Sequence, residues 1–304
     1  MTAPGTPATE RSGLLYGLGA YGLWGVFPAF FNLLAPAGAP EILAHRVVWT
    51  LGLMLVILIV IGRLGDLKAI AGRTWLLLIC ASFLISANWL IYIWAVNSDQ
   101  VVDAALGYFI TPLVSVVLGT VLFGERLNRI QVGAVLLAAV AVVLLSAGLG
   151  RPPLIAIGLA LSFGLYGAVK KVVPTDPRVS VGVETAIAAP FAIAYLLVLQ
   201  GTGDADFVNH GPLHTTLMLL CGPVTAIPLL CFAAAAQRLP LVTLGLLQYL
   251  TPSMQMIWGV LVDHEAMPPT RWVGFALIWL ALAIFSTDAL SRAYRRRTGS
   301  LQAS

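Results

Sequence analysis

Polar side chains recur at helical spacing on two otherwise apolar stretches of this chain. Their members are Tyr108, Thr111 and Ser115 in the first stretch and Gln248, Thr251 and Gln255 in the second. Positions i, i+3 and i+7 lie on one face of a helix, so each stretch presents one polar stripe. Two such helices, one in each half of a membrane protein, point to a transport pathway. We therefore predict that both stripes bind substrate.

Amide and aromatic side chains on other apolar stretches join this predicted site. Asn88 and Tyr92 lie one helical turn apart, and Trp24 and Tyr166 occupy matching positions in two similar Leu-aromatic-Gly triplets. A polar group in hydrocarbon needs a partner, so these side chains should face the interior of a helix bundle. Hydrogen bonding between neighbouring helices is the alternative role. Aromatic faces with a few amides suit an uncharged or amphipathic ligand better than a highly charged one.

Three ionisable side chains gather where one apolar stretch begins. Glu41 and His45 lie one turn apart on the expected helix, and Arg46 points about 100° away from His45. Arg46 either pairs with a nearby carboxylate (Glu41, Asp99 or Asp103) or serves as an outer gate or anion-facing residue. An unperturbed histidine titrates near neutral pH, so His45 is either a proton relay or an ordinary packing residue.

Carboxylates also stand at the ends of other apolar stretches. Glu184 enters its stretch close to Lys170 and Lys171, which predicts an ion-paired inner gate. Glu125 and Glu265 follow the two striped stretches, where each is expected to cap the next helix or to pair within a loop.

The elements that must position these residues are membrane-spanning helices. The chain is 59% hydrophobic and only 10% charged, and its apolar runs are about as long as a bilayer is thick. These runs are continuous rather than alternating, which excludes a β-barrel. We predict an all-α polytopic membrane protein with ten spans. The spans are residues 13–34, 41–62, 75–97, 103–123, 130–148, 154–171, 182–200, 214–236, 242–262 and 271–289.

The two halves match one another, and each contains five spans. An odd number of spans means that the second copy lies upside down relative to the first, so residues 13–148 and 154–289 are predicted to be inverted repeats. A chance match between apolar helices is the alternative. Of the 17 Lys and Arg residues, 14 fall on the side of the N-terminus, two on the other side and Arg46 within a span. Basic loops stay inside, so residues 1–12 and 290–304 should be cytoplasmic tails. The first 12 residues lack the features of a signal peptide, so the first span should be retained.

Four short runs resemble those of RarD-type proteins, which belong to the EamA group of the drug/metabolite transporter superfamily. The runs are residues 41–49 (EILAHRVVW), 88–97 (NWLIYIWAVN), 106–109 (LGYF) and 228–232 (PLLCF). The resemblance extends from about Gly13 to Asp288. It implies ten helices in two inverted five-helix repeats, an inner-membrane permease and small organic solutes as cargo, but it supplies no agreed catalytic residues.

We therefore predict a secondary active transporter of a small amphipathic metabolite or drug, working by alternating access in the inner (plasma) membrane. No nucleotide-binding motif occurs, which disfavours ATP drive, and proton coupling is a hypothesis based on Glu41, His45 and Glu184. No metal, cofactor or nucleic-acid partner is expected. The small-residue pair Gly13 and Gly17 leaves close helix approach or a homodimer open. The main alternatives are a membrane-embedded enzyme and a sensor or scaffold.

Overall fold

The computed structural model describes residues 7–34, 36–97, 101–146, 153–262 and 269–302, and these residues form helices and short connections. The helices are α1 (Pro7–Gly25), α2 (Phe27–Asn32), α3 (Ala39–Val60), the 3₁₀ helix η1 (Leu64–Ala69), α4 (Gly72–Asn97), α5 (Val101–Phe123), α6 (Arg129–Ser146), α7 (Leu154–Val172), α8 (Pro177–Thr202), α9 (Gly211–Arg238), α10 (Leu241–Leu247), α11 (Leu250–Leu261) and α12 (Pro269–Gln302).

Within the described residues, eight helices are long and apolar enough to cross a membrane. The predicted class, an all-α polytopic membrane protein, is confirmed. Ten uninterrupted spans are not seen. The predicted span 242–262 is divided into α10 and α11, and the last apolar stretch covers only residues Trp272–Phe285 of α12. The predicted span 13–34 corresponds to one of the eight, Thr9–Asn32, although the helix is interrupted at Val26 between α1 and α2.

A proline explains the break between α10 and α11. Pro252 has no amide hydrogen, so it cannot donate to the carbonyl of Gln248, and its ring crowds that carbonyl. The amide of Thr251 bonds Gln248 instead, with the tighter i→i+3 spacing. Pro112 occupies the matching position of the first stripe, yet α5 runs through it without interruption. The matching prolines therefore leave one striped helix continuous and the other divided.

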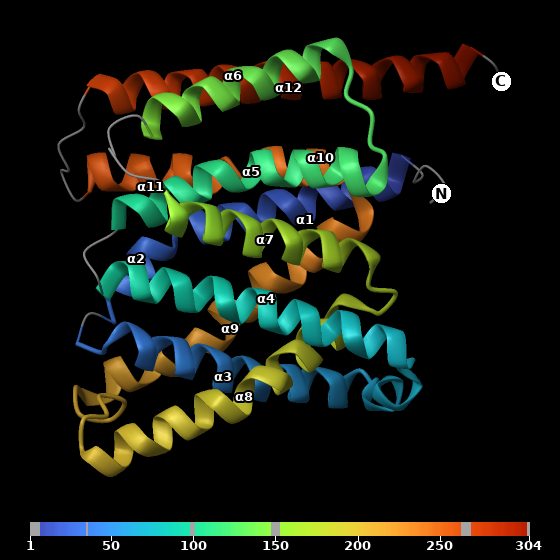
Figure 1. Cartoon of the computed structure of the whole chain (residues 1–304). Coiled ribbons are helices and arrows are strands. Elements are labelled where there is room, and N and C mark those ends of the chain that lie inside the picture. Colours follow the sequence, from blue (N-terminus) through green and yellow to red (C-terminus); the bar gives the residue numbers. More distant parts are fainter. Residues whose placement is uncertain (1–6, 35, 98–100, 147–152, 263–268, 303–304) are drawn as a thin grey trace.

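Helices of the first half pack against helices of the second half. The principal pairs are α1 with α9, α3 with α8, α3 with α9, α4 with α7, α5 with α7, α5 with α10 and α6 with α12. Figure 1 shows α6 and α12 together at one edge of the molecule and α3 and α8 at the opposite edge. The N-terminal end of α1 and the C-terminal end of α12 lie on the same side.

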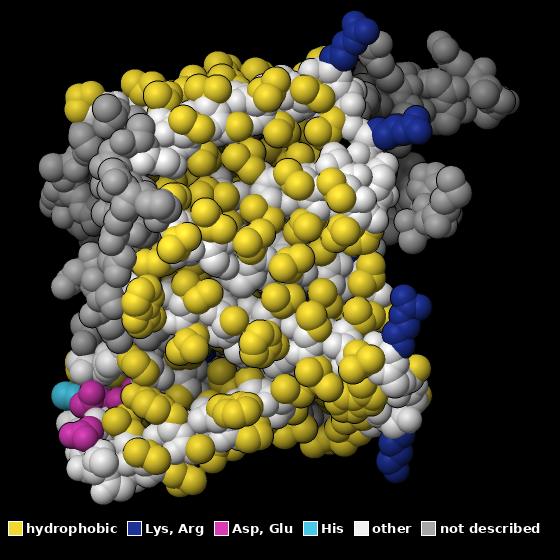
Figure 2. Space-filling model, viewed as in Figure 1, with side chains coloured by type: hydrophobic (Ala, Val, Ile, Leu, Met, Phe, Trp, Pro, Cys, Tyr) yellow, Lys and Arg dark blue, Asp and Glu magenta, His cyan; other side chains and the backbone are white. Residues whose placement is uncertain are grey.

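The visible surface has the charge distribution of a protein embedded in lipid. Figure 2 shows apolar side chains across the middle of this face, Lys and Arg along the edge where the two termini lie, and acidic side chains at the opposite edge. Large apolar side chains such as Phe191 and Val60 are 79% and 78% exposed. Such exposure is expected in hydrocarbon rather than in water.

Glycines permit the closest helix contacts. A Cβ atom on Gly222 of α9 would lie 2.7 Å from the backbone of Trp49 on α3, and one on Gly245 of α10 would lie 2.6 Å from Ser115 on α5. A Cβ on Gly17 would likewise meet Leu247 at 2.9 Å. The close approach predicted from the glycine pair of α1 thus occurs within the chain, and a homodimer stays a prediction.

Glu125 caps a helix, as its position predicted, but not the helix that follows it. Its two carboxylate oxygens accept the backbone N–H groups of Leu241 and Val242 at 2.7 and 2.9 Å. These are the first residues of α10, whose free N–H groups favour an anion. The first half therefore caps a helix of the second half. Glu265 lies outside the described residues.

Candidate functional site

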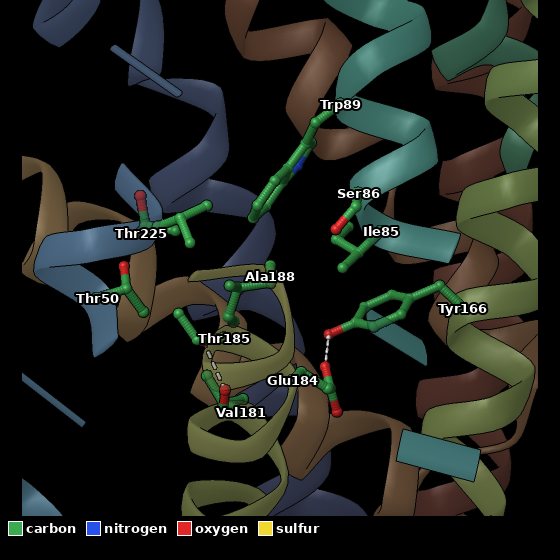
Figure 3. Close-up of a pocket in the computed structure, with 12 residues that line it drawn as sticks. Thr50, Ile85, Ser86, Trp89, Tyr166, Val181, Glu184, Thr185, Ala188 and Thr225 are labelled. Atoms are coloured by element: carbon green, nitrogen blue, oxygen red, sulfur yellow. Dashed lines mark hydrogen bonds between the residues drawn. The ribbon is translucent and has the colours of Figure 1, made fainter. Parts of the chain in front are cut away.

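A narrow cavity lies between helices of both halves, on the side of the molecule where α3 and α8 pack. Its lining residues come from α3, α4, α7, α8 and α9 and are Val47, Thr50, Ile85, Ser86, Trp89, Tyr166, Val181, Glu184, Thr185, Ala188, Thr225 and Leu229 (Figure 3). The cavity spans about 350 Å³ that protein atoms do not fill, but only about 20 Å³ can take the centre of a water molecule. One water needs roughly 10–15 Å³ by that measure, so this conformation has no room for a metabolite.

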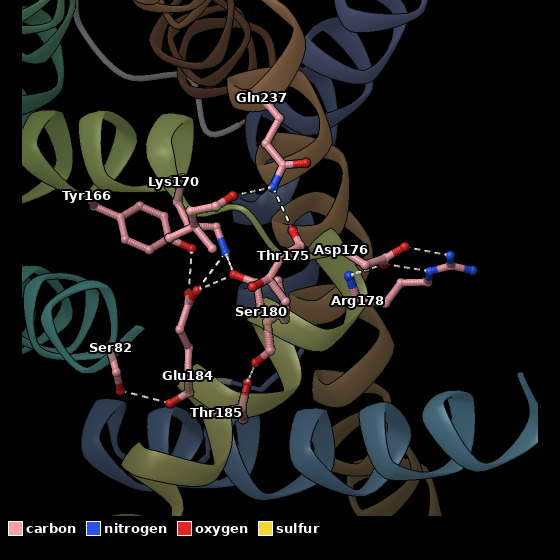
Figure 4. A network of polar contacts seen from close by, with 12 residues as sticks. Ser82, Tyr166, Lys170, Thr175, Asp176, Arg178, Ser180, Glu184, Thr185 and Gln237 are labelled. Carbon is pink, nitrogen blue, oxygen red and sulfur yellow. Dashed lines mark hydrogen bonds and ion pairs between the residues drawn. The ribbon is translucent and has the colours of Figure 1, made fainter. Parts of the chain in front are cut away.

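One end of the cavity is closed by a buried ion pair. Nζ of Lys170 lies 2.6 Å from Oε1 of Glu184, and the side chains are 0% and 5% exposed. The hydroxyl of Tyr166 donates to the other carboxylate oxygen at 3.1 Å. Ser180 donates to Oε1 at 2.7 Å and accepts from Lys170. Figure 4 shows these four side chains converging between α7 and α8.

Helix periodicity explains how this ion-pair network, defined here as Tyr166, Lys170, Ser180 and Glu184, comes together. Tyr166 and Lys170 are one turn apart on α7, and Ser180 and Glu184 are one turn apart on α8. Asp176 holds the start of α8, because its side chain accepts the N–H of Arg178 at 2.9 Å. The predicted pairing of Glu184 is confirmed with Lys170.

Lys171 has a different set of contacts, because it points away from this network. It donates to the carbonyl of Leu239 at 2.6 Å and lies 3.4 Å from Glu125. It therefore ties α7 to the start of α10 instead of reaching the cavity.

Arg46 lies at the opposite end of the cavity. Its Nε donates to the hydroxyl of Thr225 at 3.0 Å, and its guanidinium carbon lies 4.9 Å from the ring centre of Trp89. Phe31 and Phe27 face the same carbon at 5.4 and 5.9 Å. Among the described residues no carboxylate lies within ion-pair distance of Arg46. The predicted partners Asp99 and the Asp103 side chain are outside that set.

Glu41 and His45 lie beside Arg46 but form a separate cluster at the start of α3. Glu41 is 2% exposed and accepts the backbone N–H of Asp206 at 2.9 Å. The indole N–H of Trp49 donates to Nδ1 of His45 at 3.0 Å, which leaves the proton on Nε2, 3.8 Å from Glu41. His45 must therefore be neutral to accept this bond.

His214 on α9 completes this cluster, and no sequence pattern pointed to it. It is 5% exposed, and neither ring nitrogen has a hydrogen-bond partner in the part of the chain that is described. It interacts electrostatically with both Glu41 and His45. The Glu41–His45–His214 cluster therefore joins three ionisable groups from α3 and α9.

Most of the predicted stripe residues lie between helices rather than in the cavity. Thr111 donates to the carbonyl of Gly107, and Ser115 packs against Gly245. On α11, Thr251 donates to the carbonyl of Tyr21 at 2.8 Å. The Thr111 bond lies within α5, whereas the Ser115 and Thr251 contacts hold the striped helices to their neighbours, which is the alternative role of a polar stripe.

The amide side chains of the second stripe and of Asn88 also lie between helices rather than in the cavity. Gln255 donates to the carbonyl of Trp24 at 3.1 Å, and Gln248 is buried. Asn88 donates to the carbonyl of Leu159 and the hydroxyl of Ser162, which joins α4 to α7. Of the ten residues predicted to bind substrate, only Tyr166 lines the cavity in this conformation.

Three aromatic residues from the predicted set lie close to the cavity or to Arg46. Trp24 packs edge-on against Phe163 at a ring distance of 5.7 Å. Tyr92 and Tyr108 face each other at 6.0 Å, and both interact electrostatically with Arg46. The structure therefore brings Tyr92 and Tyr108 to the Arg46 end.

Several lining residues were missed, and one signal could have found some of them. Ser82, Ser86 and Trp89 occupy positions i, i+4 and i+7 on α4, which is the same kind of stripe as those on α5 and α11. Thr50 and Thr225 carry no comparable sequence pattern. Each bonds across α3 and α9 to a partner more than 170 residues away.

A second cavity is larger, with about 630 Å³ that protein atoms do not fill, but its lining is almost wholly apolar. It lies between α3 and α8, and its lining residues are Leu51, Met54, Leu55, Leu58, Leu67, Trp75, Gly182, Val183, Ala186 and Ile187. Apart from one indole N–H, no side chain there could orient a polar group. In the described part of the chain, no three His, Cys, Asp or Glu side chains are grouped to hold a metal ion.

Comparisons with known proteins agree with this architecture. A family model described as the EamA-like transporter family matches twice, at residues 11–147 and 151–287. The chain is 49% identical to Protein RarD of Streptomyces exfoliatus over 95% of its own length and 92% of the relative. It is 41% identical to an uncharacterized transporter of Vibrio cholerae, over 94% and 96% of the two chains. A solved protein structure with 20% identity has the same fold, with a TM-score of 0.69 over 90% of this chain and 96% of the other.

Proposed function

Because the chain belongs to the EamA-like transporter family, we propose that it is a secondary active transporter of a small amphipathic metabolite or drug. The observation that carries this proposal is the cavity lined by α3, α4, α7, α8 and α9, which lies between helices of both halves and has ionisable groups at both ends. A membrane-embedded enzyme would need a nucleophile or an acid/base pair at such a site. The carboxylate that lines the cavity, Glu184, is held in an ion pair with Lys170, and a relative of this chain is named as a transporter.

Two inverted five-helix repeats, residues 13–148 and 154–289, are the architecture that we propose for transport. The double match of the family model and the pairing of helices between the halves support it. The α10–α11 pair would then be one interrupted unit of the second repeat. Discontinuous helices of this kind accompany substrate sites in many secondary transporters.

Both termini would face the cytoplasm of a plasma-membrane protein. Arg and Lys side chains gather at the edge where the termini lie, and acidic side chains gather at the other edge. Basic residues are retained on the cytoplasmic side. The Lys170–Glu184 pair would then be the inner gate and Arg46 would lie towards the outside.

Alternating access requires the two ends of the cavity to open in turn, and different contacts close each end. The inner end is sealed by the ion-pair network, so opening it must separate α7 from α8 or exchange Glu184 for another partner of Lys170. The outer end contains aromatic rings and the Arg46 side chain, which can turn aside without breaking an ion pair to a described residue. The present conformation would be the one with the inner gate closed.

Proton coupling is proposed for the Glu41–His45–His214 cluster. Glu41 is buried, and His214 has two ring nitrogens without partners in the described part of the chain. A proton taken up by either group would change the charge of a buried site next to Arg46. His45 is less suited, because a second proton would break its bond to Trp49.

The test is solute flux into proteoliposomes that contain the purified chain. Candidate solutes are first selected by a thermal-shift screen of metabolites and antibiotics, and flux is then measured with and without a pH gradient. Ser86→Leu fills the cavity and should reduce flux at least about tenfold, whereas Phe83→Leu places the same side chain on the exposed face of the same helix and should leave flux intact. Equal flux for both variants would show that the cavity is not the pathway. Product formation by the purified protein in detergent would favour an enzyme.

A further inference from the structure

The geometry around Arg46 points to the class of solute. We propose that Arg46 binds the carboxylate of the transported molecule, and that this molecule is a small monocarboxylate with an aromatic or other apolar body. The inference rests on the proposed transport function, and it assigns a charge to the solute where the sequence had favoured an uncharged or amphipathic ligand.

The forked edge of the guanidinium is the first element of this site. Arg46 has five N–H donors, and Thr225 takes the one on Nε at 3.0 Å. No described residue accepts a hydrogen bond from the terminal nitrogens. Two parallel N–H groups match the two oxygens of a carboxylate, and this pairing is stronger than a neutral hydrogen bond.

The surroundings hold the guanidinium in place without neutralising it. Trp89, Phe31 and Phe27 face its central carbon at 4.9, 5.4 and 5.9 Å. Ring faces attract a cation, but they do not remove its charge. Because a cation at membrane depth is costly without a counter-ion, an anion that enters the cavity gains by pairing with it.

Two tyrosines add donors beside the same charge. The rings of Tyr92 and Tyr108 lie 6.0 Å apart, and both residues lie within electrostatic range of Arg46. Neither hydroxyl has a hydrogen-bond partner among the described side chains and backbone groups. Each could donate to a carboxylate held by Arg46, and their rings would flank an apolar body.

Of the two buried cations at the cavity, only Arg46 lacks a counter-ion among the described residues, so the site suits a solute with one negative charge. The other buried cation at the cavity, Lys170, is already neutralised by Glu184 at 2.6 Å. A dianion such as a phosphate ester would keep one negative charge uncompensated in a poorly solvated site. The aromatic walls also favour an apolar body over a heavily hydroxylated one.

Binding to the purified full-length chain in detergent tests this proposal with two matched probes. Phenylacetate and phenylacetamide have the same shape, but only the first is an anion. We expect phenylacetate to bind at least about tenfold more tightly, as a charge-assisted pair implies. Tryptophan fluorescence and thermal shift measure both affinities. Equal affinities for the acid and the amide, or tighter binding of phenyl phosphate, would overturn the assignment.

Variants locate the effect at Arg46. Arg46→Gln should remove the preference for phenylacetate, and Arg46→Lys should restore only part of it, since lysine keeps the charge but lacks the fork. Arg63→Gln removes a cation that pairs with Asp176 and should change nothing. If Arg46→Gln does not fold, Tyr108→Phe, which removes a single donor, should still weaken phenylacetate binding and leave phenylacetamide binding unchanged. An unchanged acid-to-amide ratio in Arg46→Gln or Tyr108→Phe would contradict the proposal.

The alternative is that a carboxylate of the chain itself neutralises Arg46, and Asp103→Asn tests this alternative. If Asp103 were the partner of Arg46, its removal would free the guanidinium and tighten phenylacetate binding at least about tenfold, which would overturn the proposal as stated. Unchanged affinity supports it. Flux in proteoliposomes separates the two levels of the argument. Acid-selective binding without flux would refute the transport function alone, whereas flux without acid selectivity would refute the carboxylate site alone.

Discussion

One buried cation lies at each end of the cavity between α3, α4, α7, α8 and α9, and the two cations have different contacts. At one end Lys170 contacts Glu184, Ser180 and the ring of Tyr166, so its charge is neutralised within the protein. At the other end Arg46 contacts one hydroxyl and three rings, with no carboxylate among the described residues. The first arrangement stabilises a closed contact between α7 and α8, and the second keeps a cation available to something that arrives from outside the chain.

The difference assigns distinct tasks to residues that look alike in a sequence. A buried charge with its partner in place contributes to closure, and removing either partner is strongly unfavourable. A buried charge faced by rings contributes little to closure and can act on a ligand. Substitutions at both ends of the cavity test this difference.

Lys170→Met should destabilise the protein by about 3–5 kcal/mol, because Glu184 would lose its cation while 5% exposed. The unfolding free energy can be measured in detergent by denaturant titration followed by circular dichroism. The double variant Lys170→Met with Glu184→Met should recover most of this loss, since neither buried charge remains. A loss below about 1 kcal/mol in the single variant would show that the pair does not close the inner end.

His214→Phe should stabilise the protein by roughly 1–3 kcal/mol, the usual cost of burying a polar group without a hydrogen bond. The imidazole is buried and both nitrogens lack a partner in the described structure, so phenylalanine removes that cost at similar volume. Thermal unfolding measures the shift. In proteoliposomes the same variant should lose any dependence of flux on a pH gradient. Destabilisation together with unchanged pH dependence would exclude His214 from proton coupling.

The membrane class and the Lys170–Glu184 ion pair could be predicted from sequence because they depend on local patterns. Apolar runs separated by helix-breaking residues indicated the membrane spans. Lys170 and Glu184 lie on either side of one short loop, which predicted their pairing. The choice between Lys170 and Lys171 needed the helix phase, which places only Lys170 on the face of Tyr166. Sequence alone could not show where a helix would be divided, because Pro112 and Pro252 occupy matching positions and yet only the helix that contains Pro252 is interrupted, at Gln248.

The cavity could not be predicted in the same way, because its residues meet only through tertiary packing. Arg46 and Thr225 are 179 positions apart. The stripes on α5 and α11 were assigned to substrate because polar spacing on a helix is the same for a binding site and for a helix–helix contact. Ser115 lies against Gly245, and Thr251 bonds Tyr21, so their part in substrate binding stays a prediction.

Arg46→Gln should change the unfolding free energy by less than about 1 kcal/mol. The variant loses cation–π contacts, each worth roughly 0.5–2 kcal/mol, but it also removes a charge that the described residues do not neutralise. Denaturant titration under the conditions used for Lys170→Met gives the comparison directly. A loss as large as that of Lys170→Met would mean that Arg46 is paired inside the chain, and the contrast between the two ends would disappear.

Asp176→Asn should give the smallest effect, because this carboxylate pairs with exposed cations beside the inner gate. The hydrogen bond from the Arg178 side chain, with further help from Arg63, lowers the pKa of Asp176 from 3.8 to about 2. Because the pKa of Asp176 is lower in the folded protein, its carboxylate stabilises the fold at pH values above the unfolded-state pKa of about 3.9. This stabilisation is lost as the pH falls through about 2.

The Asp176→Asn variant should therefore lose about 0.5–1 kcal/mol at pH 7, a value reduced by solvent screening. Asparagine can still accept the N–H of Arg178 as the helix cap, so the substitution isolates the charge. The difference between parent and variant should shrink as the pH is lowered from 5 towards 2. A difference that persists undiminished at pH 2 would show that capping geometry, rather than the ion pairs at the surface, is what Asp176 contributes to the closed inner end.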